Sequence, residues 1–140
     1  MTRRALAALA ALAIVSSAGP IARATPAACA SPCSIIASSA GYIAPSVEIA
    51  EGTTVHWTSI DTSHPTTDDR IDPCFIAQAG PETPLIPVKF TVAAQTLRAT
   101  IGTTTRTCDG AVAVDEGTFI LPYQCLLHPW MHGALIVTSG

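Results

Sequence analysis

Three side chains near the carboxyl end of the chain carry donor atoms that bind soft metal ions. Cys125, His128 and Met131 supply a thiolate, an imidazole and a thioether within one short loop. Sulfur ligands favour Cu(I), imidazole accepts Cu(I) and Cu(II), and two His with one Cys and a weak axial Met form an electron-transfer copper site. The loop therefore offers three of the four ligands that such a site needs.

The fourth ligand, a second imidazole, has to come from elsewhere in the chain. His64 is the favoured candidate because it lies in a polar turn just after the strand-like run 53–60. His132 adjoins Met131 and is the alternative candidate. His56 lies within the strand-like run itself, so we expect it to have a structural role.

The first 24 residues have the layout of a secretory signal peptide. A basic start precedes an apolar run, residues 5–15, that is too short to cross a bilayer comfortably, and a small-residue cleavage site follows at 22–24. We therefore expect residues 1–24 to be removed and the protein to be exported to the periplasm or the extracellular space, without a membrane span. Lipid attachment at Cys29 is an alternative, but Pro26 stands where a lipoprotein signal would have Leu or a similar residue.

Cysteine usage agrees with export. Five cysteines leave one unpaired if four form disulfides, and an exposed free thiol is a liability in an oxidising compartment unless it is bound. Cys125, in the candidate ligand loop, is the natural one to spare. We prefer a Cys74–Cys108 bridge across the middle of the domain and a local Cys29–Cys33 bridge. Four cysteines allow three connectivities, so this pairing is a preference among them.

The chain after residue 24 has the pattern of an all-β protein. Its apolar runs are short, rich in Val, Ile and Thr, and broken by Gly, Pro or Asp, and no window combines a helical period with capping residues. We expect Trp57 to lie in the core and Tyr123 to pack with its hydroxyl at a polar edge. We expect segment 61–86 to be mostly loop. Strands are predicted near 42–50, 53–60, 87–93, 96–102, 117–124 and 133–138.

The chain after the leader is long enough for one domain and too short for two. Several short strands with turn signals between them, in about a hundred residues, predict a β-sandwich or a barrel. We therefore expect residues 25–40 to be an N-terminal segment and residues 41–140 to form a single metal-binding domain.

The charge of the chain excludes one class of partner. The net charge is −3, and three of the seven basic residues, Arg3, Arg4 and Arg23, lie in the leader, so the exported part is more acidic still. Phosphate backbones would repel such a protein, and we expect no nucleic-acid partner. A basic or neutral redox partner could be steered toward it. We expect the protein itself to be a monomer.

The chain resembles the cupredoxins, the small blue copper proteins related to plastocyanin and amicyanin. Two stretches carry the resemblance, 42–64 and 123–137, and the Cys-x-x-His-x-x-Met spacing with Pro after the His is similar to amicyanin's compact ligand loop. The resemblance implies an eight-stranded Greek-key β-sandwich with one type 1 copper ion at one end. It implies as ligands His64, Cys125, His128 and Met131.

One position departs from the family pattern. Cupredoxins commonly have Asn directly after the upstream ligand His, whereas this chain has Pro65 there and contains no Asn at all. Proline has no N–H to donate, and donors to a cysteine sulfur tune the metal. The thiolate should then be a stronger donor that favours Cu(II), which lowers the reduction potential. We expect Ser63 or Thr66 to replace the usual brace.

The predicted function is that of an exported single-electron carrier cycling between Cu(II) and Cu(I). It is not expected to be an enzyme, because the chain has one copper motif and too few His for a multicopper centre. Trp130, beside His128, should offer an apolar docking surface to a redox partner. One alternative is copper sequestration or delivery outside the cytoplasm, although only two Met occur. Another is a disulfide-stabilised sandwich that binds zinc, whose closed sites normally use more Cys or His, or no metal.

Overall fold

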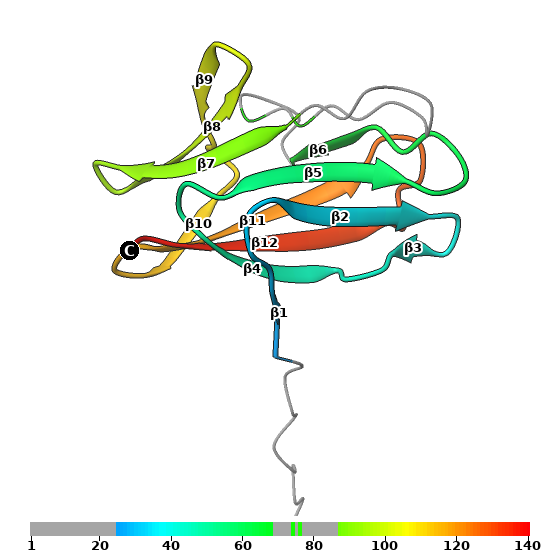
Figure 1. Ribbon diagram of the computed structural model, residues 1–140, viewed down its shortest axis with the longest axis horizontal. Coiled ribbons are helices and arrows are strands. Elements are labelled where there is room, and N and C mark those ends of the chain that lie inside the picture. Colours follow the sequence, from blue (N-terminus) through cyan, green and yellow to red (C-terminus); the bar gives the residue numbers. More distant parts are fainter. Residues whose placement is uncertain (1–24, 69–73, 75, 77–86) are drawn as a thin grey trace, which may run out of the picture.

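The computed structural model describes residues 25–68, 74, 76 and 87–140. Over that range the chain is all-β, with two mixed six-stranded sheets (Figure 1). The described part of the chain contains no helix that is long and apolar enough to cross a membrane. The predicted all-β class is confirmed for these residues, and the two sheets are consistent with a β-sandwich. The predicted signal peptide, residues 1–24, lies outside the described residues.

The first sheet carries the loop that holds the three candidate sulfur and imidazole ligands. Its order is β1-β4-β12-β11-β10, with β6 pairing β11 as well. The ligand loop is the connection that joins β11 to β12, which run antiparallel to each other. The strands are β1 (Ala27–Ala28), β4 (Ser46–Ala50), β6 (Thr66–Asp68), β10 (Val112–Asp115), β11 (Thr118–Cys125) and β12 (His132–Thr138).

The second sheet has the order β3-β2-β5-β7-β8-β9. Strand β2 runs parallel to β5, and the other neighbours are antiparallel. Residues 25–40, expected to be an N-terminal segment, thus contribute β1 to one sheet and an interior strand, β2, to the other. The strands are β2 (Cys33–Ser38), β3 (Gly41–Tyr42), β5 (Thr54–Ser59), β7 (Val88–Ala93), β8 (Thr96–Ile101) and β9 (Thr104–Thr107).

Alternation along the strands builds the core between the sheets. Successive side chains of a strand point to opposite faces, and β11 alternates half-buried and buried residues along its whole length. Strand β5 does the same, and Trp57 is only 2% exposed, as predicted. Burying each large apolar side chain stabilises the fold by roughly 1.5–3 kcal/mol. The same alternation turns Cys125, at the end of β11, into the core.

The six predicted strands are present, with one interruption. The stretch 42–50 divides into β3 and β4, separated by residues 43–45, and Pro45 has no N–H for a sheet ladder. Strands β1, β2, β6, β9 and β10 were not predicted. The last two are short and exposed and lack an apolar alternation, and β6 lies within the segment 61–86 that was expected to be mostly loop. Most of that segment lies outside the described residues.

Both predicted disulfides are present. Cys29 bonds Cys33, Cys74 bonds Cys108, and Cys125 is a buried free thiol. Because Cys29 directly follows β1 and Cys33 opens β2, the local bridge links the two sheets where the described chain begins. The odd number of cysteines therefore leaves the thiol of Cys125, at the ligand loop, without a disulfide partner.

Candidate metal centre

The ligand loop is closed by its own backbone hydrogen bonds. The Cys125 N–H donates to the Met131 carbonyl at 3.1 Å, and the Met131 N–H donates to the His128 carbonyl at 2.9 Å. Pro129, inside the second of these turns, fixes one more backbone torsion. Cys125 and Met131 are 1% and 2% exposed. The loop thus holds its thiol and thioether side chains inside the protein.

A second set of contacts brings His64 alongside the loop. The Leu126 N–H donates to the Pro65 carbonyl at 2.8 Å, and Thr66 of β6 lies opposite Cys125 of β11. His64 is fully buried. Strand pairing therefore joins two ligand segments that are 61 positions apart in the sequence.

Thr66 braces this junction from the inside. Its hydroxyl donates to the His64 carbonyl at 3.2 Å, and the Tyr42 hydroxyl lies 2.9 Å from Thr66 Oγ1. Because the Thr66 proton is used on His64, Tyr42 is the donor in the second contact. Of the two residues expected to brace the site, Thr66 makes these contacts, while Ser63 is exposed.

Three donor atoms meet at this end of the sandwich. Cys125 Sγ lies 3.4 Å from His128 Nδ1 and 3.8 Å from His64 Nδ1, and the two imidazole nitrogens are 3.1 Å apart. A triangle with these sides has a centre about 2 Å from each corner, close to the ~2.0–2.1 Å and ~2.3 Å of zinc–nitrogen and zinc–sulfur bonds. The group could therefore hold a metal ion among its three donors.

The remaining candidates lie in different positions. Met131 is buried on the loop that closes around the three donors. His132, the alternative ligand, is exposed on β12 opposite Gln124 and does not belong to the group of His64, Cys125 and His128. His56 is half-buried on β5, on the strand face away from Trp57.

The outer nitrogen of His64 meets a carboxylate that the sequence analysis missed. His64 Nε2 lies 3.1 Å from Asp61 Oδ1 and 3.0 Å from Thr62 Oγ1. The N–H groups of Ser39 and Thr62 also donate to Asp61. These hydrogen bonds hold the pKa of the Asp61 carboxyl well below its usual range. The bond from Ser39 has the largest effect, followed by those from His64 and Thr62. The only signal in the sequence was an acid three positions before a candidate ligand.

Aromatic rings pack in the core behind Cys125. Tyr123 meets Tyr42 edge-on at a centroid distance of 4.9 Å and Trp57 at 5.6 Å. Burial raises the pKa of Tyr42 to about 12, opposed by the Thr66 hydrogen bond and aided by the charge of Cys125. Burial also raises the pKa of Tyr123, and the charge of Tyr42 adds to that rise.

The prediction that the Tyr123 hydroxyl would lie at a polar edge was wrong. The side chain is fully buried, and its hydroxyl has no hydrogen-bond partner among the described residues. Alternation along β11 turns residue 123 inward, and Gly133 lies directly opposite on β12. A Cβ on Gly133 would lie 2.3 Å from Tyr123 Cζ, so the glycine leaves the room that the ring occupies.

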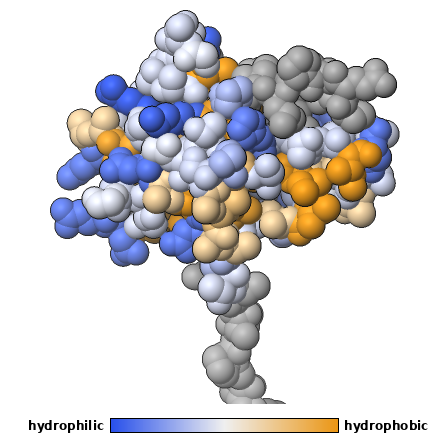
Figure 2. All heavy atoms as spheres, in the orientation of Figure 1, coloured by the Kyte–Doolittle hydropathy of each residue, from blue (hydrophilic) through white to orange (hydrophobic). Residues whose placement is uncertain are grey.

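The outer side of the centre is apolar. His128 is half-buried, and the Trp130 ring meets it at 5.1 Å while remaining 67% exposed. Figure 2 shows apolar side chains gathered at the right-hand end of the view, where β2 and β5 end in Figure 1. We define the apolar rim as the exposed residues in the loops at this end of the sandwich, Ile43, Ile60, Leu126, Leu127 and Trp130.

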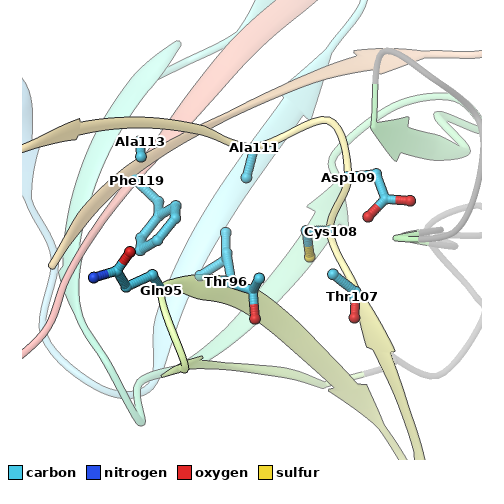
Figure 3. A pocket seen from close by; sticks show the side chains of 9 residues that line it. Gln95, Thr96, Thr107, Cys108, Asp109, Ala111, Ala113 and Phe119 are labelled. Carbon is cyan, nitrogen blue, oxygen red and sulfur yellow. The ribbon is translucent and has the colours of Figure 1, made fainter.

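A cavity of about 250 Å³ lies at another part of the fold, between β8 and β10 (Figure 3). Its lining includes the apolar residues Leu97, Ala111, Ala113 and Phe119, and Asp109 is the one carboxylate among its described lining residues. None of these residues belongs to a metal-binding group in the described part of the chain. The cavity therefore offers no chemistry comparable to that of the Cys125 loop.

The fold and the site together define an all-β protein with a His-Cys-His group that could bind a metal ion, beside a buried Met. That combination is compatible with a cupredoxin. No family model, no curated protein and no solved structure matches this chain.

Proposed function

We propose that the protein is an exported cupredoxin that carries single electrons by cycling one copper ion between Cu(II) and Cu(I). The observation that carries this proposal is the triangle of His64 Nδ1, Cys125 Sγ and His128 Nδ1, with sides of 3.1 to 3.8 Å. A trigonal group of two His and one Cys with a weak axial Met is the pattern of blue copper sites. Met131, buried on the same loop, would supply the thioether ligand.

The chain holds the donors in a frame that suits electron transfer. Bound copper would supply the one-electron couple, and the residues around it set how far the ligands move when its charge changes. The loop is closed on itself by Met131 and tied to the other ligand segment through Pro65. A frame fixed by such bonds changes little between oxidation states, and little reorganisation means fast exchange.

His128 gives the electron a route to the surface. It is the least buried of the three clustered ligands, and the apolar rim lies at its end of the sandwich. An exposed apolar patch marks a docking surface, so a redox partner protein would bind here. We assign the protein a role in carriage, not in catalysis.

Burial of the ligands favours electron carriage over copper sequestration or delivery. A delivery site has to exchange its ion with another protein, whereas here His64, Cys125 and Met131 are almost completely buried. The donor set also favours copper over zinc, because closed zinc sites use Cys and His and seldom Met. The two disulfides support export, since such bonds persist in oxidising compartments.

The test is the visible absorption spectrum of the purified protein after addition of Cu(II), recorded beside a Cys125→Ser variant. We expect an intense thiolate-to-copper charge-transfer band in the wild type and its complete loss in the variant. Circular dichroism of both proteins checks that the variant keeps its β structure. A wild-type protein that binds Cu(II) without such a band would contradict the electron-transfer assignment and point to copper handling.

A further inference from the structure

We infer that Asp61 is a positioning residue of the metal centre, whose carboxylate fixes the His64 ring so that Nδ1 is the nitrogen presented to the metal. The inference rests on the proposed function only in assuming that His64 binds a metal ion. The hydrogen bond between the two side chains belongs to the protein itself.

The chemistry of the contact decides which nitrogen of His64 carries the proton. A neutral imidazole has one N–H and one lone pair, and an ionised carboxylate can only accept hydrogen bonds. His64 Nε2 lies 3.1 Å from Asp61 Oδ1, so Nε2 is the protonated nitrogen. The lone pair of Nδ1 then faces Cys125 Sγ and His128 Nδ1, at 3.8 and 3.1 Å.

Asp61 is itself held in place, which makes it able to orient another group. Its Oδ2 accepts from the backbone N–H of Ser39, in the turn between β2 and β3, and its Oδ1 accepts from the backbone N–H of Thr62. The Ser39 contact spans 22 positions of the chain. Two fixed donors therefore restrict rotation of the carboxylate, and the β2–β3 turn is connected through Asp61 to a ligand.

The burial of His64 leaves it few other partners. The ring is 0% exposed with Asp61 in place, so the partners of Nε2 are protein groups and not bulk water. Thr62 Oγ1, at 3.0 Å, is the other contact of this nitrogen, and a hydroxyl can either donate or accept. Thr62 alone therefore does not select the tautomer, whereas the carboxylate does.

The expected consequence is on metal affinity and on the balance between oxidation states. A carboxylate bonded to the outer N–H of a ligand His fixes its orientation and raises its basicity, and its loss typically costs about 10–100-fold in metal affinity. A more basic imidazole stabilises Cu(II) more than Cu(I). Removing the carboxylate should therefore weaken Cu(II) binding and raise the reduction potential.

The experiment compares Asp61→Ala and Asp61→Asn with the wild type. Asp61→Asn keeps a hydrogen-bond acceptor without the charge, and it serves if the alanine variant does not fold. Asp115→Ala is the matched control, because it removes the same charge from an exposed position on β10, at the other end of β11 from Cys125. Nitrogen-15 NMR of the metal-free proteins reports the His64 tautomer, and chelator competition reports the affinity for Cu(II).

We expect wild-type and Asp115→Ala proteins to show a single Nε2–H tautomer and equal Cu(II) affinity. Asp61→Ala should show mixed tautomers and roughly 10–100-fold weaker Cu(II) binding, and Asp61→Asn should lie between. An unchanged tautomer and affinity in the Asp61 variants would overturn the positioning role even if copper binds normally. Altered tautomers in a protein that binds no copper would support the role of Asp61 and refute the proposed function.

Discussion

The two candidate imidazole ligands present the same nitrogen to Cys125 but have different surroundings. His64 is fully buried, with Asp61 and Thr62 against its outer nitrogen. His128 is half-buried and meets the exposed ring of Trp130. One ring is thus anchored inside the protein and the other reaches the surface. At the scale of single residues, and under the proposed function, His64 would anchor the metal centre and His128 would pass electrons to a partner.

Pro65 lies next to the buried ligand His64 and contacts the ligand loop through its carbonyl. Its carbonyl accepts from the Leu126 N–H, so the two ligand segments are tied together although proline has no N–H of its own. Substitution Pro65→Asn should add a donor next to the thiolate and so weaken its donation to copper. We expect a higher reduction potential in the variant, by roughly 40 mV for a hydrogen bond worth about 1 kcal/mol.

Protein-film voltammetry of the copper proteins measures this potential directly. Pro65→Ala is the matched control, since it restores the backbone N–H without adding a side-chain amide. Comparison of the two variants shows whether the backbone N–H or the side-chain amide raises the potential. In both variants the carbonyl of residue 65 is still present to accept from Leu126. A potential in Pro65→Asn that is equal to or below that of the wild type would refute the effect predicted for this position.

At the scale of elements, the β11–β12 hairpin decides the position of the ligand loop. Its register places Tyr123 opposite Gly133 and Gln124 opposite His132, directly before and after the loop. The hairpin also carries the inward alternation that buries Cys125. A change in the packing of this pair should therefore affect the stability of the domain and the order of the loop together.

Gly133→Ala tests that packing. The new Cβ would lie 2.3 Å from Tyr123 Cζ and 2.5 Å from its hydroxyl oxygen, and the Tyr123 side chain is fully buried. Overpacking of this kind typically costs about 1–3 kcal/mol. We expect the free energy of unfolding to fall by that amount in urea denaturation of the metal-free protein.

A double-mutant cycle separates this clash from a general effect of alanine. In a Tyr123→Leu background the ring is gone, so Gly133→Ala should cost much less than in the wild type. Equal costs in the two backgrounds would show that the tyrosine ring is not the cause. The same proteins, loaded with Cu(II), show whether the loop keeps its charge-transfer band.

At the scale of the whole molecule, the ligand loop is uncharged, whereas the exposed Asp61 adjoins Ile60 of the apolar rim. The ligand loop, residues 125–132, contains no Asp, Glu, Lys or Arg, although the chain has a net charge of −3. Acidic residues such as Glu48, Glu51 and Asp115 lie on other strands and turns. Two molecules, or a carrier and its partner, could therefore approach through the ligand-loop part of the apolar rim, Leu126, Leu127 and Trp130, with little electrostatic repulsion.

Leu127→Glu tests whether electrons cross at this surface. Leu127 is 59% exposed, so the change should not disturb the core. In self-exchange between oxidised and reduced copper protein, two new charges about 6 Å apart in water would repel by about 0.7 kcal/mol, which lowers the rate about threefold. The rate is measured by NMR line broadening, and added salt should restore it.

Val114→Glu is the control for this substitution. Val114 is also exposed, on β10 at the other end of β11 from the ligand loop (Figure 1), and it receives the same charge. Self-exchange should be almost unaffected in this variant. Equal slowing by the two substitutions would mean that net charge, not the apolar rim, controls the encounter.

Local patterns in the sequence were enough to predict much of the fold and of the candidate site. Short apolar runs rich in Val, Ile and Thr predicted six strands. Alternation along one of them predicted the buried Trp57, because the direction of a side chain on a strand follows from its position. Odd cysteine parity predicted a free Cys125, and both preferred disulfides are present. The donor types at Cys125, His128 and Met131 are close in sequence, so their proximity follows from the short loop.

Tertiary structure alone decided the contacts between distant segments. Strand β6 brings His64 to Cys125 across 61 positions, and the Ser39 N–H reaches Asp61 across 22. The inward hydroxyl of Tyr123 depends on the glycine that the hairpin register places opposite it. A sequence records which face a residue takes on its own strand, but pairing depends on which strand edges meet once the core closes, and that is a property of the folded chain.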